Sequence, residues 1–172
     1  MRGPRERLRD VNSPAVARTL LEELIASGVR DVVLAPGSRS APLALALAEA
    51  ERQGAVRLHV RIDERSAAYL ALGLARGSGS PVAVVTTSGT AAVNLHPAIV
   101  EAAYSGVPIV AVTADRPGAM RGSGANQTIH SGGPYGVYEY RGSKTLCLRK
   151  ERMKAGISDR YAIYVAANFD AT

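Results

Sequence analysis

One stretch of sequence decides the fold: VRLHVRIDERSAAY, residues 56–69. Apolar and polar residues alternate strictly over residues 56–62, which is the period of a β-strand. The alternation stops at Asp63, and an Ala- and Leu-rich run with helical character follows it. We therefore predict a strand that turns directly into a helix, with Asp63 as the helix cap and Glu64 in the first turn.

Glu64 lies at the carboxyl end of the predicted strand, which is where ligands bind in an open α/β sheet. A carboxylate in a neighbourhood rich in Ala, Leu and Tyr can share a proton with a bound ring nitrogen. The alternative is that Glu64 only complements the dipole of the helix that it begins. This stretch alone favours the second interpretation, and the neighbouring loops shift the balance.

Three more strands, rich in Val and Ile, are predicted at residues 31–35, 81–87 and 109–113. Helices are expected over residues 13–27, 41–53, 64–76 and 90–104, with a flexible linker at residues 77–80. The strands recur at intervals of roughly 25 residues, which is the spacing of right-handed βαβ units. We predict an α/β fold, a parallel sheet covered by helices on both faces.

Four loops directly follow the predicted strands, at residues 36–40, 63–64, 87–90 and 113–117. In a parallel sheet these loops share one edge and form one crevice. The crevice would collect a carboxylate, two arginines and several hydroxyls, and this favours a small-molecule site more strongly than any single loop does. The first loop resembles an anion receptor, although it has neither a P-loop nor a dinucleotide-binding pattern.

The composition excludes several classes of protein. The chain has 172 residues, of which 47% are hydrophobic and 21% are charged, a profile typical of one soluble globular domain. No apolar run approaches the roughly 18 residues of a membrane span. The net charge of +6 comes from scattered residues without interleaved aromatics, so we expect no nucleic-acid partner. The single cysteine, Cys147, fits a reducing cytoplasm.

The character of the chain changes at about residue 130. All three lysines and five of the seven tyrosines lie after that point. We expect a divergent tail over residues 131–172, with a strand at residues 161–166 and candidate strands at residues 135–140 and 144–149. A truncated gene, a fusion or a frameshift would each produce such a tail, and the sequence leaves these three origins open.

Five motifs occur in an order that resembles one family, the thiamine-diphosphate-dependent 2-succinyl-5-enolpyruvyl-6-hydroxy-3-cyclohexene-1-carboxylate synthases of menaquinone biosynthesis. They are APGSRSAPL (residues 35–43), DERSA (63–67), TSGTAAVNL (87–95), TADRP (113–117) and GANQTI (124–129). The resemblance covers residues 12–130 and implies the N-terminal pyrimidine-binding domain of such a synthase. A different thiamine-diphosphate lyase, of the acetolactate synthase type, is one alternative. A non-catalytic remnant or dimerisation module is the other.

The resemblance also implies roles for individual residues. Glu64 would be the catalytic residue, bonded to the aminopyrimidine ring of thiamine diphosphate, and Pro36 and Thr90 would also contact this cofactor. The substrates, 2-oxoglutarate and isochorismate, would be bound by Ser38, Arg39, Arg116, Asn126 and Gln127.

The family also binds Mg²⁺, through a Gly-Asp-Gly motif that this sequence lacks. We therefore expect no metal ligand in this chain and a metal site in a domain outside it. The full-length enzyme is expected to be a cytoplasmic homodimer, whereas these 172 residues alone are expected to lack synthase activity.

Overall fold

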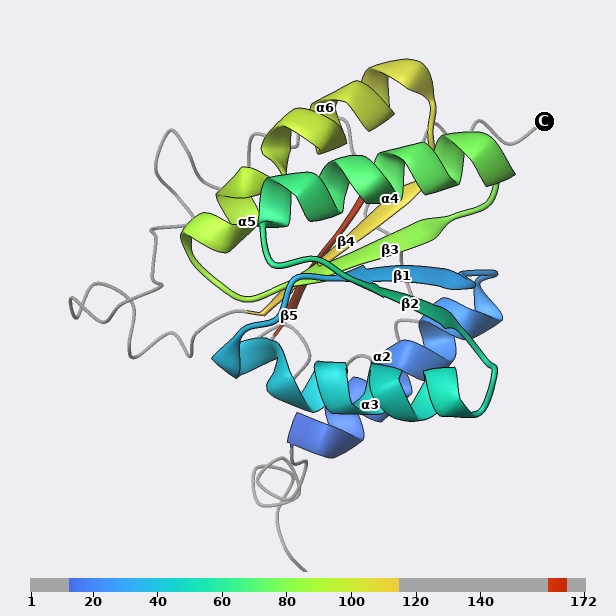
Figure 1. Ribbon diagram of the computed structural model, residues 1–172, viewed down its shortest axis with the longest axis vertical. Helices are drawn as coiled ribbons and strands as arrows, with labels where there is room; N and C mark the ends of the chain where they lie inside the picture. Colours follow the sequence, from blue (N-terminus) through green and yellow to red (C-terminus); the bar gives the residue numbers. More distant parts are fainter. Residues whose placement is uncertain (1–12, 115–160, 167–172) are drawn as a thin grey trace, which may run out of the picture.

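A five-stranded sheet with the order β2-β1-β3-β4-β5 forms the centre of the structure (Figure 1). The structure is a computed structural model that describes residues 13–114 and the backbone of residues 161–166. Its strands are β1 (Asp31–Leu34), β2 (Arg57–Val60), β3 (Val82–Thr86), β4 (Ile109–Ala114) and β5 (Tyr161–Ala166). The first four run parallel, and β5 pairs antiparallel with β4.

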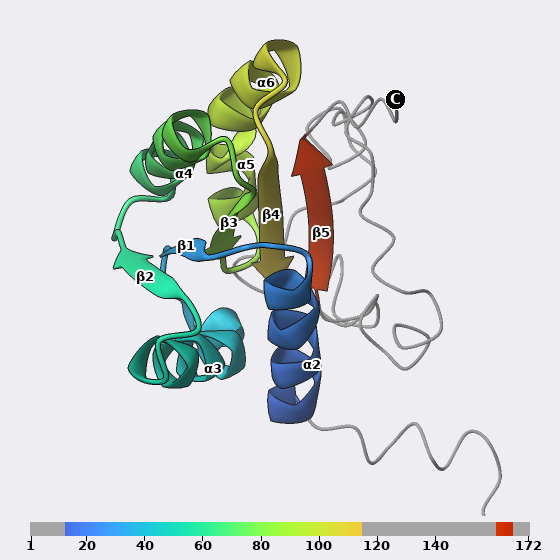
Figure 2. The ribbon, with the colours of Figure 1, turned by 90° about the vertical axis from the view of Figure 1, so that its right-hand side faces the viewer.

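Helices cover both faces of the sheet (Figure 2). On one face lie α2 (Ser13–Ala26) and α3 (Ala41–Arg52), and on the other lie α4 (Glu64–Ser78), α5 (Thr90–Asn94) and α6 (His96–Ser105). Each face has its own apolar cluster, one shared with α2 and α3 and the other with α4 and α6. The predicted α/β fold, with a parallel sheet between two helical layers, is confirmed. None of the described helices is long and apolar enough to span a bilayer.

The apolar composition of β1, β3 and β4 explains why these strands lie in the interior of the sheet. Every residue of β1, β3 and β4 is buried, as expected for Val-rich strands with a helical layer on each side. The strand predicted at residues 161–166 is present as β5. The candidate strands at residues 135–140 and 144–149 lie outside the described residues, as does Cys147.

The alternating stretch forms the edge strand β2, which is shorter than predicted. It covers Arg57–Val60 instead of residues 56–62, because the chain must already turn towards α4. Val60 and Ile62, predicted on an apolar face, are 49% and 82% exposed. The outward-facing backbone N–H of Leu58 is bonded to Oε1 of Glu51 in α3, at 3.1 Å.

Two other predictions of local structure were wrong. Half of the expected linker at residues 77–80 belongs to the last turn of α4, which runs to Ser78 and is capped by Gly79, with φ 67° and an N–H bonded to Ala75 O. The single helix expected over residues 90–104 is divided into α5 and α6 around Leu95. Pro97 explains the division, because it has no N–H to continue the helical hydrogen bonding.

Candidate functional site at the carboxyl ends of the parallel strands

The strand order creates a topological switch point between β1 and β3. From β1 the chain moves to β2 on one side, and it then crosses back to β3 on the other side. The loops after β1 and β3 therefore depart from neighbouring strands into opposite helical layers (Figure 1). In open α/β sheets this divergence forms the crevice in which ligands bind.

The loops after β1 and β3 pack directly on each other at this point. A Cβ atom placed on Gly37 would lie 2.4 Å from Cβ of Thr87, so no larger residue fits without a shift. Gly37 has φ −160°, which any residue can adopt, and glycine is therefore required here for close approach. The Ala35 N–H donates to Val85 O at 2.8 Å, and the buried Ser40 hydroxyl donates to Gly37 O at 3.1 Å.

Buried hydroxyl groups gather where β3 and β4 end. Thr86, Thr87, Ser88 and Thr113 are each at most 4% exposed. Among the described residues, Oγ1 of Thr86 and Oγ1 of Thr87 have no hydrogen-bond partner. Since buried polar groups are nearly always satisfied, these two hydroxyls are candidates to bond a ligand. Thr86 was not among the predicted site residues and Thr87 was predicted only as part of the loop at residues 87–90, although a pair of threonines ends an otherwise Val-rich strand.

The corner between β2 and α4 has the predicted cap. Asp63 adopts an extended conformation, and its Oδ1 accepts a hydrogen bond from the Ser66 N–H at 2.7 Å. This backbone hydrogen bond holds the pKa of Asp63 below its ordinary value. Glu64 is the first residue of α4 and is half-buried. The predicted cap at Asp63 and the position of Glu64 in the first turn are confirmed.

The other predicted site residues divide into two groups. Pro36, Ser38 and Arg39 lie on the loop after β1, where Pro36 and Ser38 are exposed and Arg39 is half-buried. Residues 38–40 of this loop form a short 3₁₀ helix, η1. Thr90 is exposed and begins α5. Arg116, Asn126 and Gln127 lie outside the described residues. The fold thus brings the loops with Glu64, Arg39 and Thr90 to one edge of the sheet.

Two further features bear on ligands. Within residues 13–114 and 161–166, no group of three His, Cys, Asp or Glu side chains is placed to hold a metal ion. A groove of about 450 Å³ lies between α2 and α3 and includes none of the predicted site residues. It is lined by Pro14, Arg18, Leu21, Glu22, Ile25, Pro42, Leu45, Ala46, Glu49, Ala50, Gln53 and Ala55.

A doubly covered parallel sheet whose loops converge on a switch point defines an α/β ligand-binding domain. The model of one family, described as "Thiamine pyrophosphate enzyme, N-terminal TPP binding domain", matches residues 14–132. The chain belongs to this family.

Several similar proteins carry the same name, 2-succinyl-5-enolpyruvyl-6-hydroxy-3-cyclohexene-1-carboxylate synthase. The protein from Leifsonia xyli subsp. xyli is 59% identical over 136 residues, which cover 78% of this chain and 23% of the relative. The protein from Mycobacterium tuberculosis (strain ATCC 25618 / H37Rv) is 55% identical over 139 residues, 81% of this chain and 25% of the relative. The chain spans about a quarter of the length of these relatives. The resemblance drawn from the five motifs is confirmed.

Proposed function

We propose that residues 12–130 are the pyrimidine-binding domain of a synthase with the activity that names these relatives, followed by a divergent tail over residues 131–172. The reaction would decarboxylate 2-oxoglutarate and join the remaining four-carbon unit to isochorismate. The observation that carries this proposal is the position of Glu64, at the carboxyl end of a strand beside the switch point, in a chain that belongs to a thiamine pyrophosphate family. The names of the relatives favour this synthase over an acetolactate-type lyase or a non-catalytic dimerisation module.

The residues at this edge fit one end of thiamine diphosphate, its aminopyrimidine ring. The unpartnered hydroxyls of Thr86 and Thr87 supply hydrogen-bonding groups, and Gly37 lets the loop after β1 lie close against the loop after β3. When bound, the cofactor supplies the electron sink for keto-acid decarboxylation and carbon–carbon bond formation. Glu64 would hold a proton between its carboxylate and a ring nitrogen, and Pro36 and Thr90 would complete the contacts with the ring.

The substrates of the proposed reaction carry several carboxylates and a hydroxyl. Arg39 and Arg116 suit the carboxylates, because the planar guanidinium binds a carboxylate through two parallel hydrogen bonds. Ser38, Asn126 and Gln127 would add hydrogen bonds to the remaining oxygens. Their side chains can both donate and accept, which suits hydroxyl groups.

The remaining parts of the proposal concern the longer enzyme. Mg²⁺ prefers oxygen ligands, and we assign the residues that would hold it to the part of the relatives that lies beyond the matched region. We propose a homodimer and a cytoplasmic location for the whole enzyme. The single cysteine of this chain agrees with a reducing compartment.

The decisive experiment replaces Glu64 by Gln in a full-length synthase whose N-terminal segment is residues 14–132 of this chain, joined to the rest of the Leifsonia xyli relative. General acid–base steps are worth roughly 100- to 10,000-fold, so kcat should fall by that factor while the melting temperature stays unchanged. Glu22→Gln, an exposed glutamate on α2 in the opposite helical layer, is the matched control and should leave kcat unchanged. Normal turnover in the Glu64 variant would remove Glu64 from the mechanism.

A further inference from the structure

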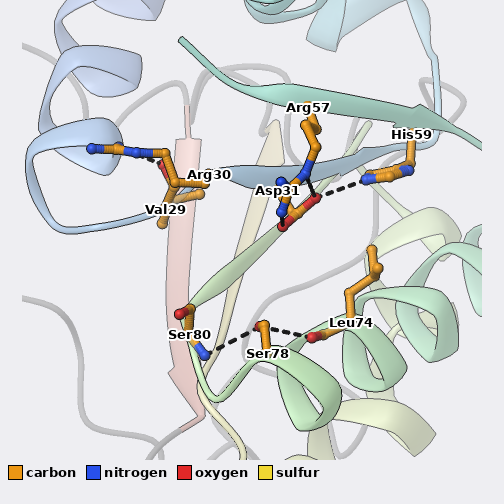
Figure 3. Close-up of polar contacts among 8 residues, drawn as sticks. All are labelled: Val29, Arg30, Asp31, Arg57, His59, Leu74, Ser78 and Ser80. Carbon is orange, nitrogen blue, oxygen red and sulfur yellow. Dashed lines mark hydrogen bonds and ion pairs between the residues drawn. The ribbon is translucent and has the colours of Figure 1, made fainter. Parts of the chain in front are cut away.

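A polar cluster of Asp31, Arg57 and His59 joins the edge strand β2 to its neighbour β1 near their amino ends, the ends opposite the loops described above (Figure 3). The Arg57 guanidinium donates two hydrogen bonds to the Asp31 carboxylate, from Nε to Oδ1 at 2.8 Å and from Nη2 to Oδ2 at 2.5 Å. His59 Nε2 lies 2.9 Å from the same Oδ1. Asp31 is only 6% exposed, so its charge depends on these two partners.

The cluster links β2 to β1, and β2 is the strand that leads to Glu64 at the ligand-binding edge. Among the described strands β2 has a single neighbour, β1, and all of its residues are half-buried or exposed. Backbone hydrogen bonds tie the two strands together, from Arg57 N to Arg30 O at 2.7 Å and from Arg61 N to Leu34 O at 3.0 Å. Glu64 follows the second of these bonds by three residues, so the register of β2 decides where Glu64 lies.

The hydrophobic pattern of β2 does not select that register. The stretch of residues 56–62 alternates throughout, and a slip of two residues against β1 exchanges one apolar residue for another on the core face. The same slip moves the β2–α4 corner along the sheet by roughly 7 Å. Such a displacement is larger than a hydrogen bond tolerates, so Glu64 would no longer meet the same ligand atom.

Asp31 distinguishes the registers. In the observed pairing Asp31 lies opposite Arg57, and Val33 lies opposite His59. A slip in one direction would put His59 opposite Asp31 and Arg61 opposite Val33, so the two hydrogen bonds donated by the directly opposite Arg57 would be lost. A slip in the other direction would put Ala55 there, which offers no side-chain donor. Either slip costs the buried carboxylate its strongest partner, which is expensive for a charged group.

We propose that Asp31 is a positioning residue, which selects the register of β2 through Arg57 and His59 and thereby holds Glu64 at the ligand-binding edge. The catalytic part of this inference rests on the proposed function of Glu64, whereas the selection of register does not.

The test uses NMR on the 172-residue chain and its Asp31→Asn variant, which keeps the size of the side chain and removes its charge. Amide exchange at Arg57 and Arg61 should become at least about tenfold faster, because charge-assisted hydrogen bonds are lost. The contact between Val32 and Leu58, which are opposite in the observed register, should be joined by contacts of Val32 with Val56 or Val60. Amides of β3 and β4 should exchange as before.

Two comparisons separate register selection from ordinary stabilisation. Glu101→Gln removes a partly exposed ion pair with Arg76, at 3.3 Å, that joins α6 to α4, and it should leave β2 unchanged. His59→Gln, which retains an amide donor, should keep more of the β2 protection than His59→Leu does. If Asp31→Asn left the Val32–Leu58 contact as the single pattern, the inference would be overturned, even if exchange became faster throughout the sheet.

Measurements of kcat distinguish a failure of this inference from a failure of the proposed function. In the full-length synthase, Asp31→Asn should lower kcat at least about tenfold, since Glu64 spends less time in place. Normal kcat in Asp31→Asn combined with a large loss in Glu64→Gln would overturn the positioning role alone. Normal kcat in Glu64→Gln would overturn the proposed function alone, and the NMR result would still decide the register.

Discussion

Replacing Gly37 by Ala should destabilise the fold by overpacking at the switch point. The added Cβ would lie 2.4 Å from Cβ, 2.7 Å from Cγ2 and 3.0 Å from Oγ1 of Thr87. The backbone of Gly37 is extended, so alanine brings no conformational strain and the contact with Thr87 is the whole effect. Overpacking of this kind typically costs about 1–3 kcal/mol. With an m-value of roughly 2 kcal/mol/M, the urea midpoint should fall by about 0.5–1.5 M.

A double-mutant cycle with Thr87 identifies the contact. In a Thr87→Gly background the Gly37→Ala change should cost almost nothing, because the opposing Cβ is gone. In a Thr87→Ala background most of the cost should remain, because the contact at 2.4 Å joins two Cβ atoms. Gly73 in α4 provides the matched control. Among the described residues its added Cβ has no neighbour within 4 Å, so Gly73→Ala should stabilise the helix by about 0.5–1 kcal/mol.

Urea unfolding monitored by circular dichroism measures all of these variants. Unchanged stability in Gly37→Ala would refute the close packing of the two loops. Equal recovery in the Thr87→Ala and Thr87→Gly backgrounds would show that the side chain beyond Cβ, and not the Cβ contact, sets the cost.

Three further outcomes are expected. Hydrogen bonds from Arg57 and then His59 lower the pKa of Asp31 from 3.8 to about 2, so Asp31 should add about 2.5 kcal/mol to the free energy of unfolding above pH 4. That contribution should be lost as the pH falls from about 4 to 2, and the Asp31→Asn variant should lack it at every pH. Acid-unfolding titrations of both proteins will measure the difference. Thr86→Val replaces an unpartnered buried hydroxyl with a methyl group and should raise the free energy of unfolding by about 1–3 kcal/mol; a decrease would mean that the hydroxyl has a partner. In the full-length synthase, Arg39→Ala should raise KM for isochorismate by roughly 10- to 100-fold, the equivalent of a lost charge-assisted hydrogen bond, and leave the affinity for thiamine diphosphate unchanged in calorimetry.

The interior of the fold could be predicted because its signals are local. Unbroken Val-rich runs become β1, β3 and β4, and Asp63 caps α4 because a single side chain reaches an amide three residues away. The limits of β2 could not be predicted, since alternation describes which way side chains point and says nothing about how many neighbours a strand has. Likewise, Gly and Ser at residues 77–80 have the composition of a linker, but the buried face of α4 continues to Ala75 and its last turn extends to Ser78.

The unpredicted part of the site depends on contacts between distant residues. The approach of Gly37 to Thr87 becomes visible only once β1 and β3 are neighbours in the sheet. Asp31 contacts Arg57 and His59, which lie 26 and 28 residues further along the chain, and a periodic sequence pattern does not predict contacts between such distant residues. The five motifs instead located the family directly, because each preserves a loop whose partners are elsewhere in the chain.

The side chains around β2 also determine how this molecule behaves in a crowded solution. An edge strand with free backbone groups is a template on which another chain can add a strand, and such additions lead to aggregation. Here the outward N–H of Leu58 donates to Glu51 Oε1 at 3.1 Å, and the carbonyl of Val60 accepts a hydrogen bond from Arg61 Nη1 at 2.7 Å. A foreign strand must first displace both side chains and approach two arginine charges, Arg57 and Arg61. The edge strand β2 can therefore expose Val60 to water, and the turn that follows it can expose Ile62, without serving as a nucleus for β-aggregation.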